Sequence, residues 1–202
     1  DPATEVVLLG GIPADSPSHN GGAMRFGPDG ALWITTGDAS SFNAVDVRAL
    51  RTQQLDSLAG KLLRVGADGR GLVDNPFWNG DAEAVRSKVW AYGFRNPFRL
   101  TFRPASGRPY TADVGANDWE EVNAVARGGN HGWPCVEGPA PQAGYQALAE
   151  CQALYAQGSG AVSLPLVAYP HGGGTASITG GAFYTGTALP EPYRGAYFFG
   201  DF

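Results

Sequence analysis

Three short polar motifs of this 202-residue chain carry residue types that can do chemistry. In residues 18–22 (SHNGG), His19 is followed by an asparagine and two glycines, and residues 95–97 (RNP) follow an apolar run. Residues 115–121 hold three carboxylates within four positions. Imidazoles serve as general bases, guanidiniums hold carboxylates, and carbonyl and carboxylate oxygens bind calcium. A plain β-sheet needs none of these groups at its strand ends.

Each motif also has an explanation that involves no function. His19 stands beside glycine-rich sequence and can be an ordinary turn residue. Arg95 can pair with a carbonyl at a strand edge. The acidic group of Asp118, Glu120 and Glu121 can form a solvated turn.

The elements that must position these motifs are short β-strands. The chain has 30 Gly and 15 Pro, is 11% aromatic and only 16% charged, which favours many short strands and tight turns. The expected strands are residues 5–11, 23–26, 31–36, 61–65, 89–94, 100–102, 110–114, 166–169, 178–184 and 195–202. Residues 47–60 are expected to be a loop, and residues 81–88 a helical turn. The fold class predicted is all-β.

An internal repeat refines this prediction. Residues 24–33 and 100–110 share the pattern apolar-x-Phe-x-Pro-turn-Gly-x-x-aromatic, and residues 182–184 with 195–198 form a looser third copy. The copies lie roughly 80 residues apart, about twice the length of a propeller blade. A hairpin repeated in this way favours a β-propeller over a sandwich, and the chain length then predicts about four blades.

Cys135 and Cys151 flank a loop that is rich in Pro, Gly and Ala. With no CxxC motif and no other cysteine, this pair favours a local disulfide and an oxidising compartment. Two independent reduced thiols are the alternative. Residues 135–164 are expected to be a stapled insertion outside the core.

Charge and hydropathy exclude two classes of partner. The net charge is −5 and no basic run exceeds two residues, so the sequence predicts no nucleic-acid partner. Its apolar runs are too short for a transmembrane segment. The chain starts without Met or a signal-peptide pattern and stops at Phe202 in mid-strand, so we expect a fragment of a longer precursor.

Five stretches together resemble the soluble PQQ-dependent glucose/sorbosone dehydrogenase superfamily, with the bacterial aldose sugar dehydrogenases as the closest type. They are SHNGGAMRFGPDGALWITTGD, LAGKLLRV, YGFRNPFRLTF, ADVGANDWEEVN and GGNHGWP. The resemblance implies a six-bladed β-propeller, with residues 1–202 as part of it. It also implies the cofactors PQQ and Ca²⁺, an aldose substrate oxidised at C1 to the lactone, an unidentified electron acceptor, and a periplasmic or secreted protein.

Site residues follow from the same resemblance. His19 matches the general base that removes the C1 hydroxyl proton while hydride passes to PQQ. Arg95 and Asn96 match a pair that contacts the cofactor.

The implied metal ligands lie later in the chain. Gly115 and Ala116 match the positions whose carbonyls hold the calcium ion that clamps PQQ, although the family usually has Pro at the second position. Glu121, with the carbonyl of His131, matches a second, structural calcium site.

Two departures keep other functions open. Ser18 stands where the glucose-specific enzyme has an acidic residue, so glucose specificity is not implied. Thr185 stands near the position at which that enzyme has a cofactor-contacting Lys. The alternatives are a non-enzymatic extracellular binding propeller of the hedgehog-interacting type and a calcium-dependent hydrolase on a similar propeller. Further cofactor contacts of the family fall outside residues 1–202, so the isolated chain is expected to be inactive.

Overall fold

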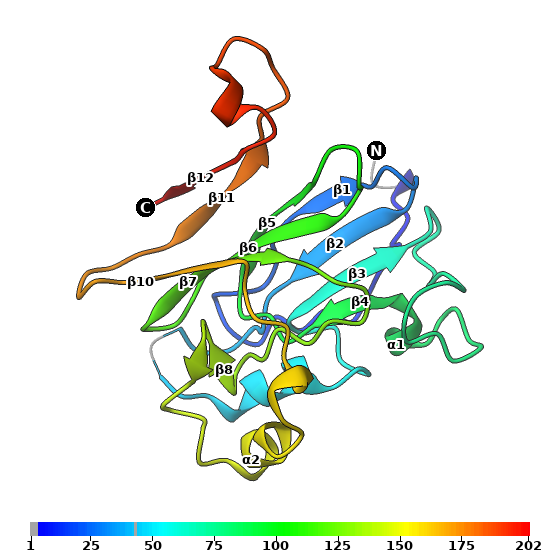
Figure 1. The fold of residues 1–202 in the computed structure, drawn as a ribbon. Coiled ribbons are helices and arrows are strands. Elements are labelled where there is room, and N and C mark those ends of the chain that lie inside the picture. The colour runs from blue at the N-terminus through cyan, green and yellow to red at the C-terminus, as the bar shows by residue number, and fades with distance from the viewer. Residues whose placement is uncertain (1–3, 43) are drawn as a thin grey trace.

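The computed structural model of the protein describes residues 4–42 and 44–202 and is built from antiparallel sheets (Figure 1). One four-stranded sheet has the order β1 (Met24–Phe26), β2 (Leu32–Thr36), β3 (Lys61–Val65) and β4 (Val89–Tyr92). A second has the order β5 (Pro97–Phe102), β6 (Pro109–Asp113), β7 (Trp119–Ala124) and β10 (Val167–Pro170). Two-stranded sheets pair β11 (Ile178–Phe183) with β12 (Tyr197–Asp201) and β8 (Val136–Glu137) with β9 (Ala140–Pro141).

The helices are few and short, which agrees with the predicted all-β class. They are α1 (Val85–Lys88), α2 (Ala149–Tyr155) and the 3₁₀ turns η2 (Val47–Gln53), η3 (Ser159–Ala161) and η4 (Glu191–Tyr193). In the part of the chain that the structure describes, no helix is long and apolar enough to cross a membrane.

The β1–β2 hairpin shows how local sequence sets a strand pair. Gly30 has a φ of 78°, which glycine adopts without strain. The Asp29 carboxylate accepts hydrogen bonds from the Ala31 backbone N–H at 3.2 Å and from Trp33 Nε1 at 3.1 Å. These contacts close the turn and align Met24 with Ile34.

The core lies where the first two sheets meet. Trp33, Leu62 and Phe94 of the first sheet and its edge are buried together with Leu100 of β5 and Val125 after β7. Burial of such side chains contributes roughly 1.5–3 kcal/mol each relative to exposure, so this cluster fixes one sheet against the other. The loops that leave the two sheets at the same end are thereby brought together.

The expected number of blades differs from the structure. The described residues form two four-stranded sheets, the β11–β12 hairpin and the short β8–β9 pair, not about four four-stranded blades. Each copy of the sequence repeat forms the first hairpin of a sheet, namely β1–β2, β5–β6 and β11–β12. The spacing of roughly 80 residues between copies therefore corresponds to one sheet, not to the two blades expected from it. The spacing is long because long connections separate the strands within each sheet.

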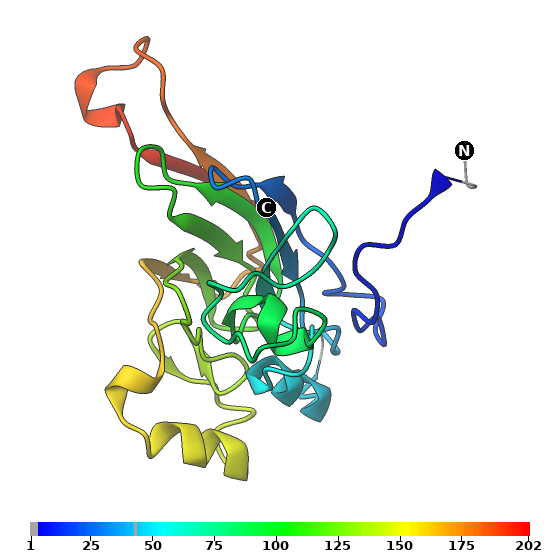
Figure 2. The same cartoon turned by 90° about the vertical axis from the view of Figure 1, so that its right-hand side faces the viewer.

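Three local predictions were also wrong. Residues 5–11 form no strand, and in Figure 2 the segment before β1 extends away from the sheets, with Val6 and Val7 exposed. The expected loop after Asp46 contains η2, whose first turn is capped by the Asp46 side chain accepting from the Arg48 backbone N–H. Strand β7 was not predicted, because its charged residues hid the strand pattern.

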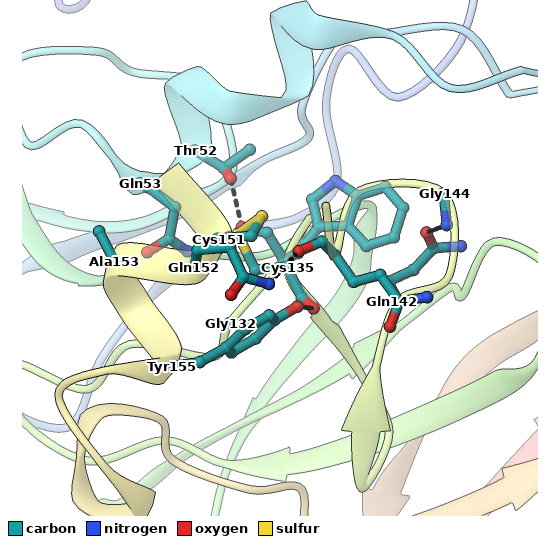
Figure 3. The surroundings of a disulfide bond; sticks show 12 residues. Thr52, Gln53, Gly132, Cys135, Gln142, Gly144, Cys151, Gln152, Ala153 and Tyr155 are labelled. Atoms are coloured by element: carbon teal, nitrogen blue, oxygen red, sulfur yellow. Dashed lines mark hydrogen bonds between the residues drawn. A yellow bond between two sulfur atoms is a disulfide. The ribbon is translucent and has the colours of Figure 1, made fainter. Parts of the chain in front are cut away.

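The predicted disulfide between Cys135 and Cys151 is confirmed. It ties α2 to the segment before β8, and Figure 3 shows Thr52 and Gln53 on one side of it and Tyr155 on the other. The segment between the two cysteines was expected to lie outside the core, but part of it is buried. Both cysteines are fully buried, in a cluster with Trp133, Tyr145 and Leu154. These side chains form a small core of their own around the bridge.

Candidate functional site

His19 lies in the loop before β1 and contacts the loop that follows β2. Its Nδ1 atom is 2.9 Å from Asp38 Oδ1, and the two side chains are 6% and 0% exposed. The Ala39 backbone N–H donates to the His19 carbonyl at 3.0 Å. A Cβ at Gly37 would lie 2.1 Å from that same carbonyl oxygen, so only glycine allows the two loops to approach this closely. The sequence therefore builds the His19–Asp38 pair from both sides.

Asp38 is an ionised acceptor despite its burial. It also accepts hydrogen bonds from the Ser40 backbone N–H at 2.9 Å, from Ser40 Oγ at 2.7 Å and from Trp133 Nε1 at 2.8 Å. Burial opposes ionisation, but the hydrogen bonds from His19 and Ser40 outweigh it and lower the pKa of Asp38. An ionised carboxylate only accepts, so Nδ1 of His19 carries a proton, and in the neutral form of the imidazole the lone pair is on Nε2.

Trp133 connects this pair to Arg95. The indole N–H of Trp133 donates to Asp38, and the Arg95 guanidinium carbon lies 5.4 Å from the centroid of the Trp133 ring. The Asp38 backbone N–H also donates to the Arg95 carbonyl at 2.8 Å. Residues from three distant parts of the sequence thus form one connected group.

Arg95 is a buried cation, 5% exposed. Its Nη1 donates to the carbonyls of Val114, at 3.1 Å, and of Gly115. Burial lowers the pKa of Arg95, while the nearby Asp38 and Asp113 favour its charged form. Among the described residues, no carboxylate lies within ion-pair distance of this guanidinium. Its positive charge is therefore available to an anionic ligand.

A cavity of about 160 Å³ opens beside Arg95. Its lining includes Arg95, Ala116, Asn117, Trp133, Gln142 and Tyr145. The hydroxyl of Tyr145 accepts from the Asp46 backbone N–H at 2.9 Å, which holds the loop before η2 against the disulfide-bonded segment. That segment therefore supplies one wall of the cavity.

Asn96 lies next to Arg95 at the start of β5. Asp113 at the end of β6 accepts from the backbone N–H groups of Arg95, at 3.1 Å, and of Asn96, at 2.6 Å. Burial, together with the neighbouring Glu121 carboxylate, raises the pKa of Asp113 well above its usual value. These two bonds fix the backbone of the cofactor pair suggested by the sequence.

The loop of residues 115–119 is organised by Glu137, a residue that the sequence did not single out. Its Oε1 accepts from four consecutive backbone N–H groups, at 2.7 Å from Ala116, 3.1 Å from Asn117 and Asp118, and 3.2 Å from Trp119. Glu137 is 3% exposed, and its Oε2 is buried without a hydrogen-bond partner among the described residues.

Glu121 lies on β7 and is buried, as is its neighbour Glu120, so the solvated-turn explanation is wrong for both. Glu121 accepts from Asn123 Nδ2 at 3.0 Å and from the Gly138 backbone N–H at 2.6 Å. Burial raises the pKa of Glu121 to about 7, and the neighbouring Glu137 and Glu120 act in the same direction. Only Asp118 of the acidic group remains exposed.

His131 faces the same region. Its Nδ1 lies 3.0 Å from Asn123 Oδ1, its ring stacks on Phe94 at 4.5 Å, and its Nε2 is buried without a hydrogen-bond partner among the described residues. Burial lowers the pKa of His131 to about 3, so the imidazole is neutral. A cavity of about 10 Å³, room for a single small species, is lined by Arg95, Gly115, Glu121, His131 and Glu137.

The oxygen donors that could bind calcium differ between the two sites suggested by the sequence. Within residues 4–42 and 44–202, no group of three or more His, Cys, Asp or Glu side chains is placed to hold a metal ion. A site at Glu121 would therefore depend on backbone oxygens as well. At Gly115 the carbonyl already accepts from Arg95, but a carbonyl oxygen has two lone pairs and can also ligate a cation.

A model of the Glucose / Sorbosone dehydrogenase family matches residues 3–202. The chain belongs to this family. Quinoprotein glucose dehydrogenase B of Acinetobacter calcoaceticus is 36% identical over 152 residues, which cover 69% of this chain and 30% of that relative. The HIPL2 protein of Arabidopsis thaliana is 34% identical over 225 residues, covering 98% of this chain and 30% of that protein.

Solved structures of Glucose / Sorbosone dehydrogenase relatives share the fold. The PQQ-bound form of Aldose Sugar Dehydrogenase from Streptomyces coelicolor superposes with a TM-score of 0.63 at 29% identity, over 86% of this chain and 41% of that one. The chain thus spans less than half of that structure and about a third of the curated relatives.

The candidate site contains residues that sequence reasoning named and others that it missed. The structure joins His19, Arg95 and Gly115 through Asp38 and Trp133. Asp38 and Trp133 were visible only as strand-end and motif residues. Glu137 gave one signal, an acidic residue directly before Gly138 after an apolar stretch, which is too common to be informative.

Proposed function

We propose that this chain carries the base and part of the cofactor site of a PQQ-dependent sugar dehydrogenase, which oxidises an aldose at C1 to the lactone. The observation that carries the proposal is the buried His19–Asp38 pair, connected through Trp133 to the buried Arg95 guanidinium, which has no carboxylate partner within residues 4–42 and 44–202. Proton abstraction and anion binding are the two tasks that this chemistry requires of the protein. Family membership supports the same activity.

His19 has the geometry of a general base. Asp38 holds the Nδ1 proton, so the Nε2 lone pair can take the proton of the C1 hydroxyl. Once His19 is protonated, the ionised Asp38 stabilises the imidazolium at 2.9 Å. When bound, PQQ supplies the acceptor for the hydride that leaves C1.

The residues around Arg95 fit an anionic cofactor. PQQ carries three carboxylates and a quinone, and a buried guanidinium beside a cavity of about 160 Å³ is a suitable partner for such a group. Asn96 would contribute from the adjacent position. The carbonyls of Gly115 and Ala116 would hold Ca²⁺, and Glu121 with the His131 carbonyl would hold a second ion.

Dye reduction tests the proposal in the protein expressed at its natural full length. With PQQ and Ca²⁺ added, we expect an aldose-dependent reduction of an electron-acceptor dye across a panel of sugars. Omission of PQQ is the control and should abolish the signal. A correctly folded protein that binds PQQ but oxidises no aldose would contradict the proposal, and the panel would also identify the sugar.

A non-enzymatic binding propeller is the second candidate. It is favoured by Thr185, near which the resemblance aligns a cofactor-contacting Lys, and by the plant HIPL relatives, which match 98% of this chain. In that case the same protein would show no PQQ binding by absorbance titration. The retained His19 and Arg95 favour the enzyme.

We further infer a periplasmic or secreted location, because the buried Cys135–Cys151 bridge needs an oxidising environment to form. The two sheets and the hairpin are interpreted as blades of a propeller, with residues 135–164 as a stapled insertion. A free-thiol assay on denatured, unreduced protein from its native compartment should find no labelled cysteine.

A further inference from the structure

Glu137 is the side chain that contacts most of the loop between β6 and β7. One carboxylate oxygen accepts from the backbone N–H groups of Ala116, Asn117, Asp118 and Trp119, at distances between 2.7 and 3.2 Å. Hydrogen bonds to a charged acceptor are about twice as strong as neutral ones. A loop without regular structure is thus held by four bonds to a single atom.

These bonds determine where two particular carbonyls point. In a trans peptide the N–H and C=O groups lie in one plane and point in opposite directions. The N–H of Ala116 shares its peptide with the Gly115 carbonyl, and the N–H of Asn117 shares its peptide with the Ala116 carbonyl. Because both N–H groups face Glu137, both carbonyls face away from it. The hydrogen bond from Arg95 to the Gly115 carbonyl agrees with this orientation.

We propose that Glu137 is a positioning residue that aims the Gly115 and Ala116 carbonyls at a divalent cation. The inference rests on the proposed function, which assigns those carbonyls to the calcium ion of the cofactor site. Glu137 does not touch the ion through Oε1, because that oxygen is engaged by the four amides. It acts by preventing the two peptide planes from turning.

The neighbourhood of Glu137 is itself fixed. The adjacent Gly138 N–H donates to Glu121 at 2.6 Å, and a Cβ at Gly138 would lie 2.5 Å from the Trp119 ring. The Cys135–Cys151 bridge lies two residues before Glu137. The disulfide-bonded segment therefore carries the residue that shapes the loop, which gives this insertion a role in the site.

Amide hydrogen exchange in the protein without cofactor tests the first half of the proposal. In full-length Glu137→Ala, we expect the amides of residues 116–119 to exchange at least about tenfold faster than in the wild type. Glu137→Gln keeps an oxygen acceptor without the charge and should give a smaller increase. Glu150→Gln, an exposed glutamate of the same segment, is the matched control and should change nothing.

A calcium titration without PQQ tests the second half. We expect Glu137→Ala to weaken calcium binding by about tenfold or more, and Glu137→Gln to fall between it and the wild type. Unchanged exchange at residues 116–119 in both variants would overturn the role of Glu137 in the loop. Faster exchange with unchanged calcium affinity would overturn its link to the ion.

These results are separable from the proposed function. If Glu137→Ala does not fold, the Gln variant supplies both measurements, because it has nearly the same volume. A wild-type protein that shows the expected exchange and calcium binding but oxidises no aldose would refute the dehydrogenase proposal and leave the role of Glu137 standing.

Discussion

Two buried carboxylates in the neighbourhood of Arg95, Asp38 and Glu121, behave in opposite ways. Asp38, after β2, has a lowered pKa, whereas Glu121, on β7, has a pKa raised to about 7. Both are buried, so burial alone does not explain the difference. Asp38 accepts from an imidazole, an indole, a hydroxyl and a backbone N–H. Glu121 has an amide and a backbone donor but lies near two other carboxylates.

The contrast shows that donors and like charges set the protonation state of a buried acid. Around Asp38 the arrangement favours the ionised carboxylate, which orients His19. On the Glu121 side it produces an excess of negative charge that a cation or protons can neutralise. The predictions below test this difference in full-length protein, from the largest expected effect to the smallest.

Removal of the proposed base, His19, should cause the largest loss of turnover. We expect His19→Ala to lower turnover by about 10²–10⁴-fold with PQQ binding retained, because a general base contributes that much and Arg95 is untouched. Steady-state kinetics with a parallel PQQ titration measure this. Arg25→Ala, exposed on β1, is the control. Near-normal turnover in His19→Ala would show that the base lies elsewhere.

Asp38→Asn should have a smaller effect on the same reaction. It removes the charge that fixes the His19 tautomer, and we expect turnover to fall by about 10²-fold. Because the pKa of Asp38 is lowered in the folded protein, its ionisation contributes stability above the unfolded pKa, which is lost as pH falls through the folded pKa. Denaturant unfolding should therefore show a deficit for the variant at pH 7 that shrinks below about pH 4. A deficit that is constant with pH would contradict this interpretation.

For Glu121, the free energy of unfolding should depend on pH in the opposite direction. Its pKa is raised from 4.5 to about 7, so in calcium-free protein the folded state binds more protons than the unfolded state between these values. Stability should fall as pH rises through this window and level off above it. We expect Glu121→Gln to remove that slope and to gain about 3 kcal/mol over the wild type at pH 8. Urea unfolding in EDTA from pH 4 to 9 measures both, and parallel curves would refute the assignment.

Bound calcium should favour the ionised form of Glu121, so that this carboxylate behaves more like Asp38. At a free concentration ten times its dissociation constant, one bound ion stabilises the folded state by about 1.4 kcal/mol. We expect Ca²⁺ to raise the melting temperature and to abolish the pH slope attributed to Glu121, because a bound cation keeps the carboxylate ionised. Thermal melts in Ca²⁺ and in EDTA test this, with Mg²⁺ as a control. Identical melts would show that no calcium site exists in this region.

Sequence reasoning succeeded where a local rule sufficed. The PDG turn predicts the β1–β2 hairpin, the short segment that ends in the turn of residues 67–69 predicts β3 at its observed bounds, and two cysteines without other partners predict the disulfide. It failed for β7, where Glu120 and Glu121 resemble a solvated turn. It also failed for the number of blades, because strand spacing in the sequence does not show which strands share a sheet.

By itself, the sequence determined the family and the all-β class and named most residues of the candidate site, because these follow from local patterns and a matching order of motifs. Only the tertiary structure decided that Asp38 and Trp133 connect His19 to Arg95, and that Glu137 shapes the loop of Gly115 and Ala116. These relations depend on loops from two sheets meeting at one end. Such proximity is created by packing of the core and is not encoded in any single stretch of chain.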